Sequence, residues 1–115
     1  MSDEKREFLV PEGFGEWKQV PGMPDGAREI ITYRDEKSGT YARFLILDPG
    51  FPGADKTLVH DFDELVYVVS GSLVNRFTDE VYPAGSLAVF PAGMKHGSFK
   101  APEGSFCLEF RHYKK

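Results

Sequence analysis

The sequence lacks the features that mark several large classes of protein. Its single cysteine, Cys107, excludes an internal disulfide, which favours a reducing compartment and predicts a cytoplasmic location. No apolar run approaches the length of a membrane span, and the charged start MSDEKREF is unlike a secretion signal. With a net charge of −4 and no basic patch, we expect neither a nucleic-acid nor a membrane partner.

What the chain does contain indicates a small all-β domain. Its 115 residues suffice for one domain with a core, and ten phenylalanines can fill that core. Glycine and proline break the sequence at short intervals, which is typical of a β-sandwich or barrel. The segments between the breaks are rich in β-branched and aromatic residues, and we expect strands at 28–34, 40–48, 64–71, 72–77, 86–92 and 105–113.

Two of these strands have faces that can be read from alternation. In 105–111, Phe106, Leu108 and Phe110 alternate with polar or small residues, which predicts that these three side chains point inward. In 64–69, Glu64 shares a face with two valines. A carboxylate on an apolar face is costly unless a cation or hydrogen bonds compensate it. Glu64 therefore lies either at a wet strand end or beside a bound cation.

The N-terminal part differs from the rest. Residues 1–25 are interpreted as an arm and residues 26–115 as the barrel domain. The stretch 8–22 is apolar but interrupted by proline and glycine, so we expect it to pack over another surface. It forms either an edge strand of the same barrel or a strand exchanged with a partner subunit.

Two stretches carry candidate metal ligands among the three histidines of the chain. In 57–71, TLVHDFDELVYVVSG, His60 precedes Glu64, which is followed by six residues and Gly71. In 85–100, GSLAVFPAGMKHGSFK, a glycine, five residues, Pro-x-Gly, two residues and His96 follow in order. The second pattern matches the second motif of the cupin family except at its last position, where lysine replaces the usual asparagine.

The first stretch resembles the first cupin motif, His-x-His followed by a glutamate and, six residues later, a glycine. His60 stands where the second histidine belongs, and Leu58 stands where the first belongs. The resemblance covers about residues 40–110. The chain is similar in particular to the cupin branches of anti-sigma-factor sensor domains and of acetylacetone-dioxygenase-like enzymes.

The resemblance implies an antiparallel jelly-roll, or double-stranded β-helix, barrel with ligands converging in its mouth. His60, Glu64 and His96 would then bind one divalent transition metal per chain. Two imidazoles and a carboxylate suit Fe(II) best, and Mn, Ni, Co or Zn also fit. Because Leu58 removes one usual ligand, either the site is open to a bidentate substrate or the barrel has lost its metal.

Residues near these ligands are candidates for substrate binding. Strand alternation from His96 predicts that Ser98 and Lys100 point into the cavity, and other residues flank the ligands. The expected substrate-binding residues are Leu58, Phe62, Met94, Ser98 and Lys100.

The function that the resemblance implies is metal-dependent chemistry on a small oxygenated organic molecule, of dioxygenase or enolate type. A non-catalytic sensor or binding module is the first alternative, and a sugar or sugar-acid isomerase or binder is the second. Cupins commonly pair through sheet faces and N-terminal strands, so a homodimer is also expected.

Overall fold

A computed structural model describes residues 11–113 of the chain, so residues 1–10 of the predicted arm and the last two residues lie outside the description. The elements are η1 (Pro11–Phe14), β1 (Lys18–Gln19), β2 (Ala27–Arg34), β3 (Tyr41–Leu47), β4 (Thr57–Val59), β5 (Asp63–Asn75), β6 (Val81–Pro83), β7 (Leu87–Phe90), β8 (Lys95–Gly97), β9 (Phe99–Lys100) and β10 (Ser105–His112). Within 11–113, no helix has the length and apolar character to cross a membrane.

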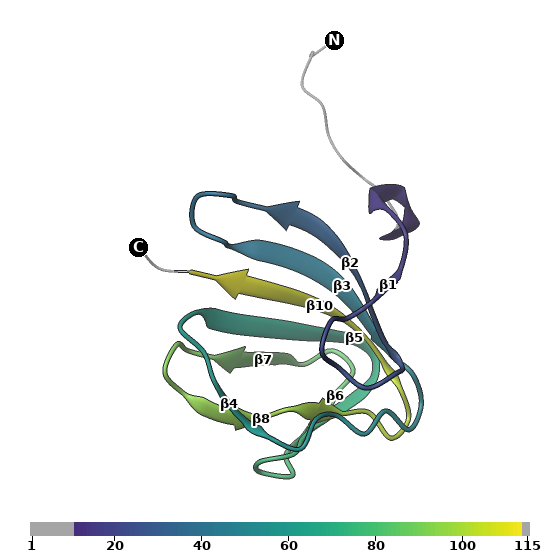
Figure 1. Cartoon of the computed structure of the whole chain (residues 1–115). Coiled ribbons are helices and arrows are strands. Elements are labelled where there is room, and N and C mark those ends of the chain that lie inside the picture. The colour runs from purple at the N-terminus through teal and green to yellow at the C-terminus, as the bar shows by residue number, and fades with distance from the viewer. Residues whose placement is uncertain (1–10, 114–115) are drawn as a thin grey trace.

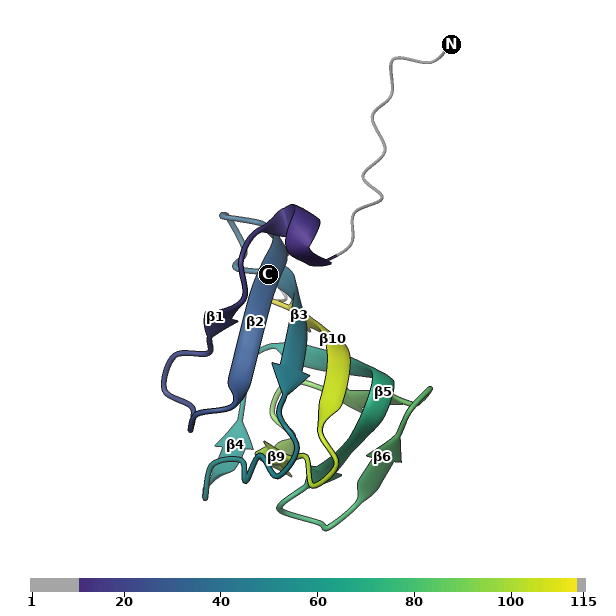
Figure 2. The ribbon, with the colours of Figure 1, turned by 90° about the vertical axis from the view of Figure 1, so that its right-hand side faces the viewer.

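The strands form one curled antiparallel sheet and a small second ladder (Figure 1). The main path runs β1-β2-β3-β10-β5-β6, and β7 and β9 also pair with β5. The separate β4–β8 ladder lies across the interior from β2 and β3, as the turned view in Figure 2 also shows for β4. The all-β jelly-roll architecture predicted from the sequence is confirmed.

The long strand β5 joins two segments that the sequence separates, 64–71 and 72–77. A bulge lets it continue, because the register against β10 shifts between Phe106 and Cys107. Gly71 lies at this point with φ of 74°. A Cβ there would collide with the carbonyl oxygen of Gly104, so only glycine permits the approach of the two strands.

The interior face of the sheet holds the core. Glu64, Val66 and Val68 are 3%, 1% and 0% exposed, which confirms that they share a buried face. Val20 also belongs to the core cluster, so the region predicted as an arm contributes to the interior. β1 pairs with β2 as a short edge strand.

The prediction for the faces of 105–111 was wrong. Cys107 and Glu109 are 0% and 2% exposed, whereas Leu108 and Phe110 are 39% and 38% exposed. Phe106 also points outward, where its ring lies 5.9 Å from that of Phe44. The polar face can be buried because arginines inside the barrel pair with Glu109, and the outer face of the sheet is unusually apolar.

Candidate functional site

Three short segments position the predicted ligands. His60 immediately follows β4, Glu64 is the second residue of β5, and His96 is the middle residue of β8. The turn after β7 is tied to the first segment, because the Gly93 amide donates to the His60 carbonyl at 2.9 Å. Gly93 has φ of 87°, a conformation that glycine adopts without strain, so the Pro-x-Gly pattern shapes a turn that brings β8 to β4.

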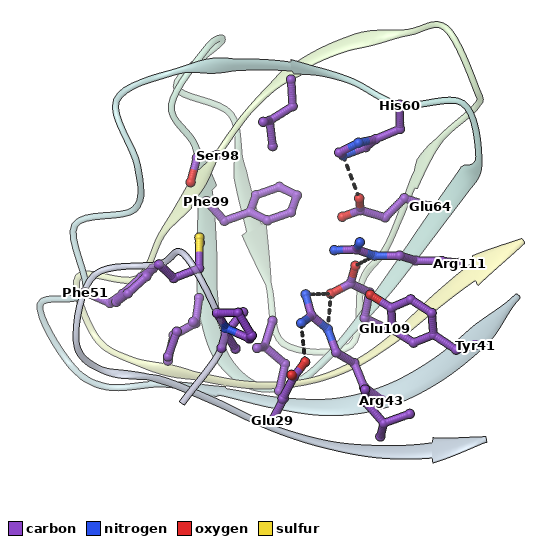
Figure 3. A pocket seen from close by; sticks show the side chains of 18 of the residues that line it. Glu29, Tyr41, Arg43, Phe51, His60, Glu64, Ser98, Phe99, Glu109 and Arg111 are labelled. Carbon is purple, nitrogen blue, oxygen red and sulfur yellow. Dashed lines mark hydrogen bonds and ion pairs between the residues drawn. The ribbon is translucent and has the colours of Figure 1, made fainter. Parts of the chain in front are cut away.

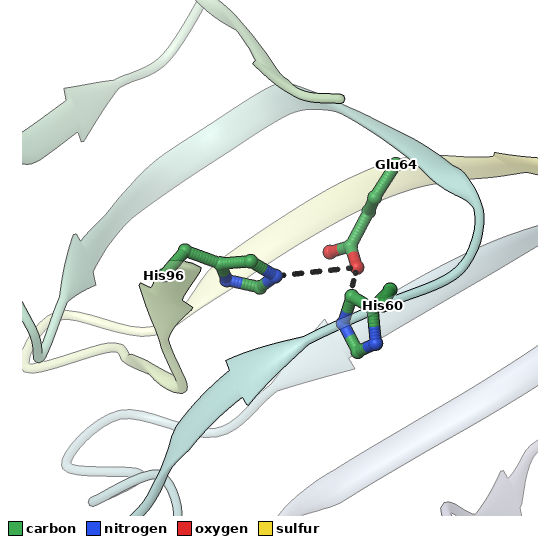
Figure 4. A group of neighbouring side chains, drawn as sticks. All are labelled: His60, Glu64 and His96. Atoms are coloured by element: carbon green, nitrogen blue, oxygen red, sulfur yellow. Dashed lines mark ion pairs between the residues drawn. The ribbon is translucent and has the colours of Figure 1, made fainter. Parts of the chain in front are cut away.

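The structure brings the three predicted ligands together inside the barrel (Figure 4). One ligand atom from each of His60, Glu64 and His96 lies within 4.8 Å of the others. The Nε2 atom of His60 is 3.2 Å from Oε1 of Glu64, and Nε2 of His96 is 3.9 Å from the same oxygen. Glu64 and His96 are buried, and His60 is half-buried.

The hydrogen bonding of His96 leaves Nε2 facing Glu64. Its Nδ1 lies 2.9 Å from the carbonyl oxygen of Gly97, which can only accept, so Nδ1 is the donor in this contact. The Nε2 atom of His96 and Oε1 of Glu64 are both buried, and neither has a hydrogen-bond partner within 11–113. With Nε2 of His60 3.2 Å from the same oxygen, these three atoms surround a position that a cation can fill.

Aromatic rings hold both imidazoles in place. The His96 ring stacks on Phe90 and also contacts Phe99, with centroids 4.4 and 5.8 Å away, and those two phenyl rings lie 5.6 Å from each other. The His60 ring stacks on Phe62 with centroids 4.2 Å apart. These contacts fix the ring planes, so the donor atoms need little rearrangement on binding a metal.

The ligands open onto a cavity of about 390 Å³, which is large enough for a small organic ligand. Two of the five expected substrate-binding residues, Leu58 and Ser98, line this cavity. Phe62 is buried behind His60 and is outside the lining. Met94 is 47% exposed, and it and Lys100 are also outside the lining.

Leu58 occupies a place from which a fourth ligand would reach the group. It is the direct cross-strand partner of His96 in the β4–β8 ladder. Directly opposed residues in an antiparallel pair project to the same face. The leucine therefore presents an apolar wall beside the ligands.

A buried ion network forms another wall of the cavity (Figure 3). Arg43 donates to Glu109 from Nε and Nη2, at 2.9 and 2.6 Å, and to Glu29 from Nη1 at 2.6 Å. Arg111 donates from Nε to the other oxygen of Glu109 at 2.7 Å. Burial would raise the pKa of Glu109, but the two arginines outweigh burial and hold that pKa below its usual value.

The sequence reading missed Glu109 and Arg111 as cavity residues because it assigned the faces of 105–111 the wrong way round. A signal was present: Glu109 and Arg111 are two positions apart and so share a face with Cys107. Arg43, on the neighbouring strand β3, lines the cavity as well.

Comparison with solved structures identifies the fold. An RmlC-like cupin from Shewanella frigidimarina aligns with a TM-score of 0.73 and 18% identity over 96% of this chain and 94% of that one. KdgF from Halomonas sp. aligns with a TM-score of 0.74 and 18% identity over 96% of each chain. The protein has a cupin fold.

The cupin branches expected from the sequence also appear among the similar structures. An acetylacetone dioxygenase from Acinetobacter johnsonii aligns at TM-score 0.73 and 13% identity, over 96% of this chain and 76% of that one. The anti-sigma factor ChrR of Rhodobacter sphaeroides, solved in complex with SigE, aligns with a TM-score of 0.62 and 24% identity. The alignment covers 84% of this chain and 49% of that one. No protein-family model and no curated protein matches the chain. At these identities the likeness establishes the cupin fold alone.

Proposed function

We propose that this cupin binds one divalent transition metal through His60, Glu64 and His96 and acts on a small oxygenated organic molecule. Fe(II) is the favoured metal because two imidazoles and one carboxylate, with open positions, form the set used in non-haem iron oxygenases. The reaction class we favour is dioxygenation with O₂ as co-substrate. Enolate chemistry uses the same ligands.

One observation carries the proposal. Oε1 of Glu64 and Nε2 of His96 are buried 3.9 Å apart and lack hydrogen-bond partners within the described chain. A buried carboxylate oxygen and a buried ring nitrogen that lack hydrogen bonds are unfavourable unless another group compensates them. A divalent cation held by His60, Glu64 and His96 would remove that cost. The similarity to an acetylacetone dioxygenase supports the choice of chemistry.

The chain's own residues have separate tasks in this proposal. When bound, the metal would supply Lewis acidity towards chelating oxygens and, as Fe(II), the capacity to react with O₂. The stacked rings of Phe90 and Phe99 keep His96 aligned. Leu58 excludes water from one side of the ligands. The missing fourth ligand leaves an additional position for a substrate that binds through two oxygen atoms.

Oxygen uptake tests the proposal. Protein reconstituted anaerobically with Fe(II) is mixed with acetylacetone in aerated buffer, and O₂ is followed with an electrode. We expect uptake by wild type, its loss in His96→Ala, and normal uptake in His112→Ala, whose side chain is 50% exposed outside the ligand group. Uptake that His96→Ala leaves unchanged would contradict the proposal.

A non-catalytic binding module is the second candidate, and Leu58 favours it because the chain has one ligand fewer than the usual cupin set. The same samples separate the two functions. A rise in melting temperature with acetylacetone but no O₂ uptake, across Fe(II), Mn(II), Ni(II), Co(II) and Zn(II), would indicate binding without oxygenation.

A further inference from the structure

Arg111 lies next to the proposed metal ligands on the cavity wall. In the antiparallel pairing of β10 with β5, Arg111 is directly opposite Glu64. The two side chains therefore project to the same interior face, with Cβ atoms roughly 5 Å apart. Figure 3 shows the Arg111 guanidinium inside the cavity, between Glu64 and Glu109.

The guanidinium of Arg111 is fixed in place but retains free donors. Its Nε donates to Glu109 at 2.7 Å. Its plane lies against two rings, with the central carbon 4.9 Å from the Phe62 centroid and 5.3 Å from that of Tyr41. Within 11–113, its two terminal nitrogens, Nη1 and Nη2, donate no hydrogen bond. Two adjacent N–H groups in a rigid plane match the two oxygens of a carboxylate.

Arg43 is less suited to this role, because each of its three nitrogens already donates to Glu29 or Glu109. Its position instead fixes Glu109, which in turn holds Nε of Arg111. The network of two arginines and two glutamates is neutral by formal charge. It therefore pre-organises Arg111 without consuming its terminal donors.

The other charges lining the cavity also favour an anion. Outside the network, the lining contains the cations Arg34 and Lys56 and the carboxylate Glu64, besides the two histidines. Neither Arg34 nor Lys56 forms an ion pair within the described residues. A divalent cation at the ligand group would add two more positive charges. A ligand with a negative charge balances this excess better than a neutral one.

We propose that Arg111 anchors the substrate and that the substrate is a small oxo- or hydroxycarboxylate. Nη1 and Nη2 donate to its carboxylate, while its oxo or hydroxy oxygen lies towards His60, Glu64 and His96. The short separation of Arg111 from Glu64 requires these two groups to be only a few bonds apart. This inference rests on the proposed function, since the second contact uses the metal.

Calorimetric titration with two matched probes tests the assignment. Acetoacetate carries a carboxylate where acetylacetone carries an uncharged acetyl group, so the pair isolates the charge. Wild type loaded with Mn(II) under nitrogen is compared with Arg111→Met, Arg111→Lys and Arg34→Met. The matched control, Arg34, also lines the cavity and also lies over Tyr41, at 4.9 Å.

We expect Arg111→Met to weaken acetoacetate binding about tenfold or more, because charge-assisted hydrogen bonds are lost. The affinity for acetylacetone should stay within about twofold of wild type. Arg34→Met should weaken acetoacetate only about twofold, as the loss of an exposed charge does. Arg111→Lys retains a positive charge beside Glu109 but loses the planar pair of donors, so its affinity for acetoacetate should still fall several-fold. Because the charge is kept, this variant controls for misfolding.

Three results would overturn the assignment. Arg111→Met and Arg34→Met could lose the same affinity for acetoacetate, Arg111→Met could lose the same affinity for both probes, or wild type could fail to bind acetoacetate. Metal content is measured on every sample. A wild type without metal would refute the proposed function, whereas a metal-loaded Arg111→Met with unchanged acetoacetate affinity would refute only the anchor.

Discussion

Leu58 and His96 face each other across the β4–β8 ladder, and both line the cavity. This pairing places Leu58, which stands where the first histidine of the cupin motif belongs, beside the three proposed ligands. We expect Leu58→His to add a fourth ligand and to lower the dissociation constant for Zn(II) about tenfold or more, since each added imidazole contributes a coordinate bond.

Competition with a chromogenic chelator measures this change. The matched control is Val59→His, because Val59 is the next residue, is 57% exposed and projects to the opposite side of the strand. Equal affinities in wild type and Leu58→His would mean that position 58 does not reach the metal.

Glu109 is the buried carboxylate whose loss should affect stability most. Glu109→Gln leaves Arg43 and Arg111 with a weaker partner, and we expect the free energy of unfolding at pH 7 to fall by about 3–5 kcal/mol. Urea denaturation measures this. Asp48→Asn is the control, since Asp48 pairs with Arg28 on the surface and should cost less than about 1 kcal/mol.

The contribution of Glu109 should also depend on pH. Its folded pKa lies below the unfolded value of 4.5, so its stabilisation is complete well above pH 4.5 and is lost as the pH falls through the folded pKa. The stability difference between wild type and Glu109→Gln should therefore shrink in acid. A constant difference from pH 7 to pH 3 would contradict this account.

Cys107 should be unreactive in the folded protein. Burial raises its pKa to about 11, and its side chain has no exposed surface. At pH 8 roughly a thousandth of the thiol is ionised, so iodoacetamide should label the native protein far more slowly than the urea-unfolded protein. Mass spectrometry counts the label. Rapid, complete labelling of folded protein would show that the strand opens or that the thiol is accessible.

The homodimer predicted from the sequence remains a proposal, and the outer sheet face offers it a surface. Exposed apolar side chains there lie on adjacent strands β5, β7 and β10, namely Tyr67, Val69, Leu87, Val89, Leu108 and Phe110. A face without charges suits a second copy of itself in a two-fold dimer. We expect a dimer by light scattering, a monomer for Leu108→Lys, and a dimer for the control Val81→Lys. A monomeric wild type would refute the proposal.

The sequence was informative where a residue's neighbours along the chain determine its surroundings. Glycine and proline positions predicted an all-β domain, and the resemblance to the two cupin motifs grouped His60, Glu64 and His96, which the structure brings within 4.8 Å. The faces of 105–111 could not be read from alternation, because apolar residues occupy the outer face of this sheet. Their orientation depends on Arg43, 66 residues from Glu109 in the chain, which compensates the buried carboxylate.

Metal content of the purified protein tests the central claim most directly. Wild type, Glu64→Ala, His96→Ala and the control His112→Ala are each loaded with Fe(II) anaerobically, desalted and analysed by plasma mass spectrometry. We predict near one metal per chain in wild type and His112→Ala, and little in the other two, since each removes one of three ligands. Metal-free wild type after loading with Fe(II), Mn(II), Ni(II) and Zn(II) would contradict the account.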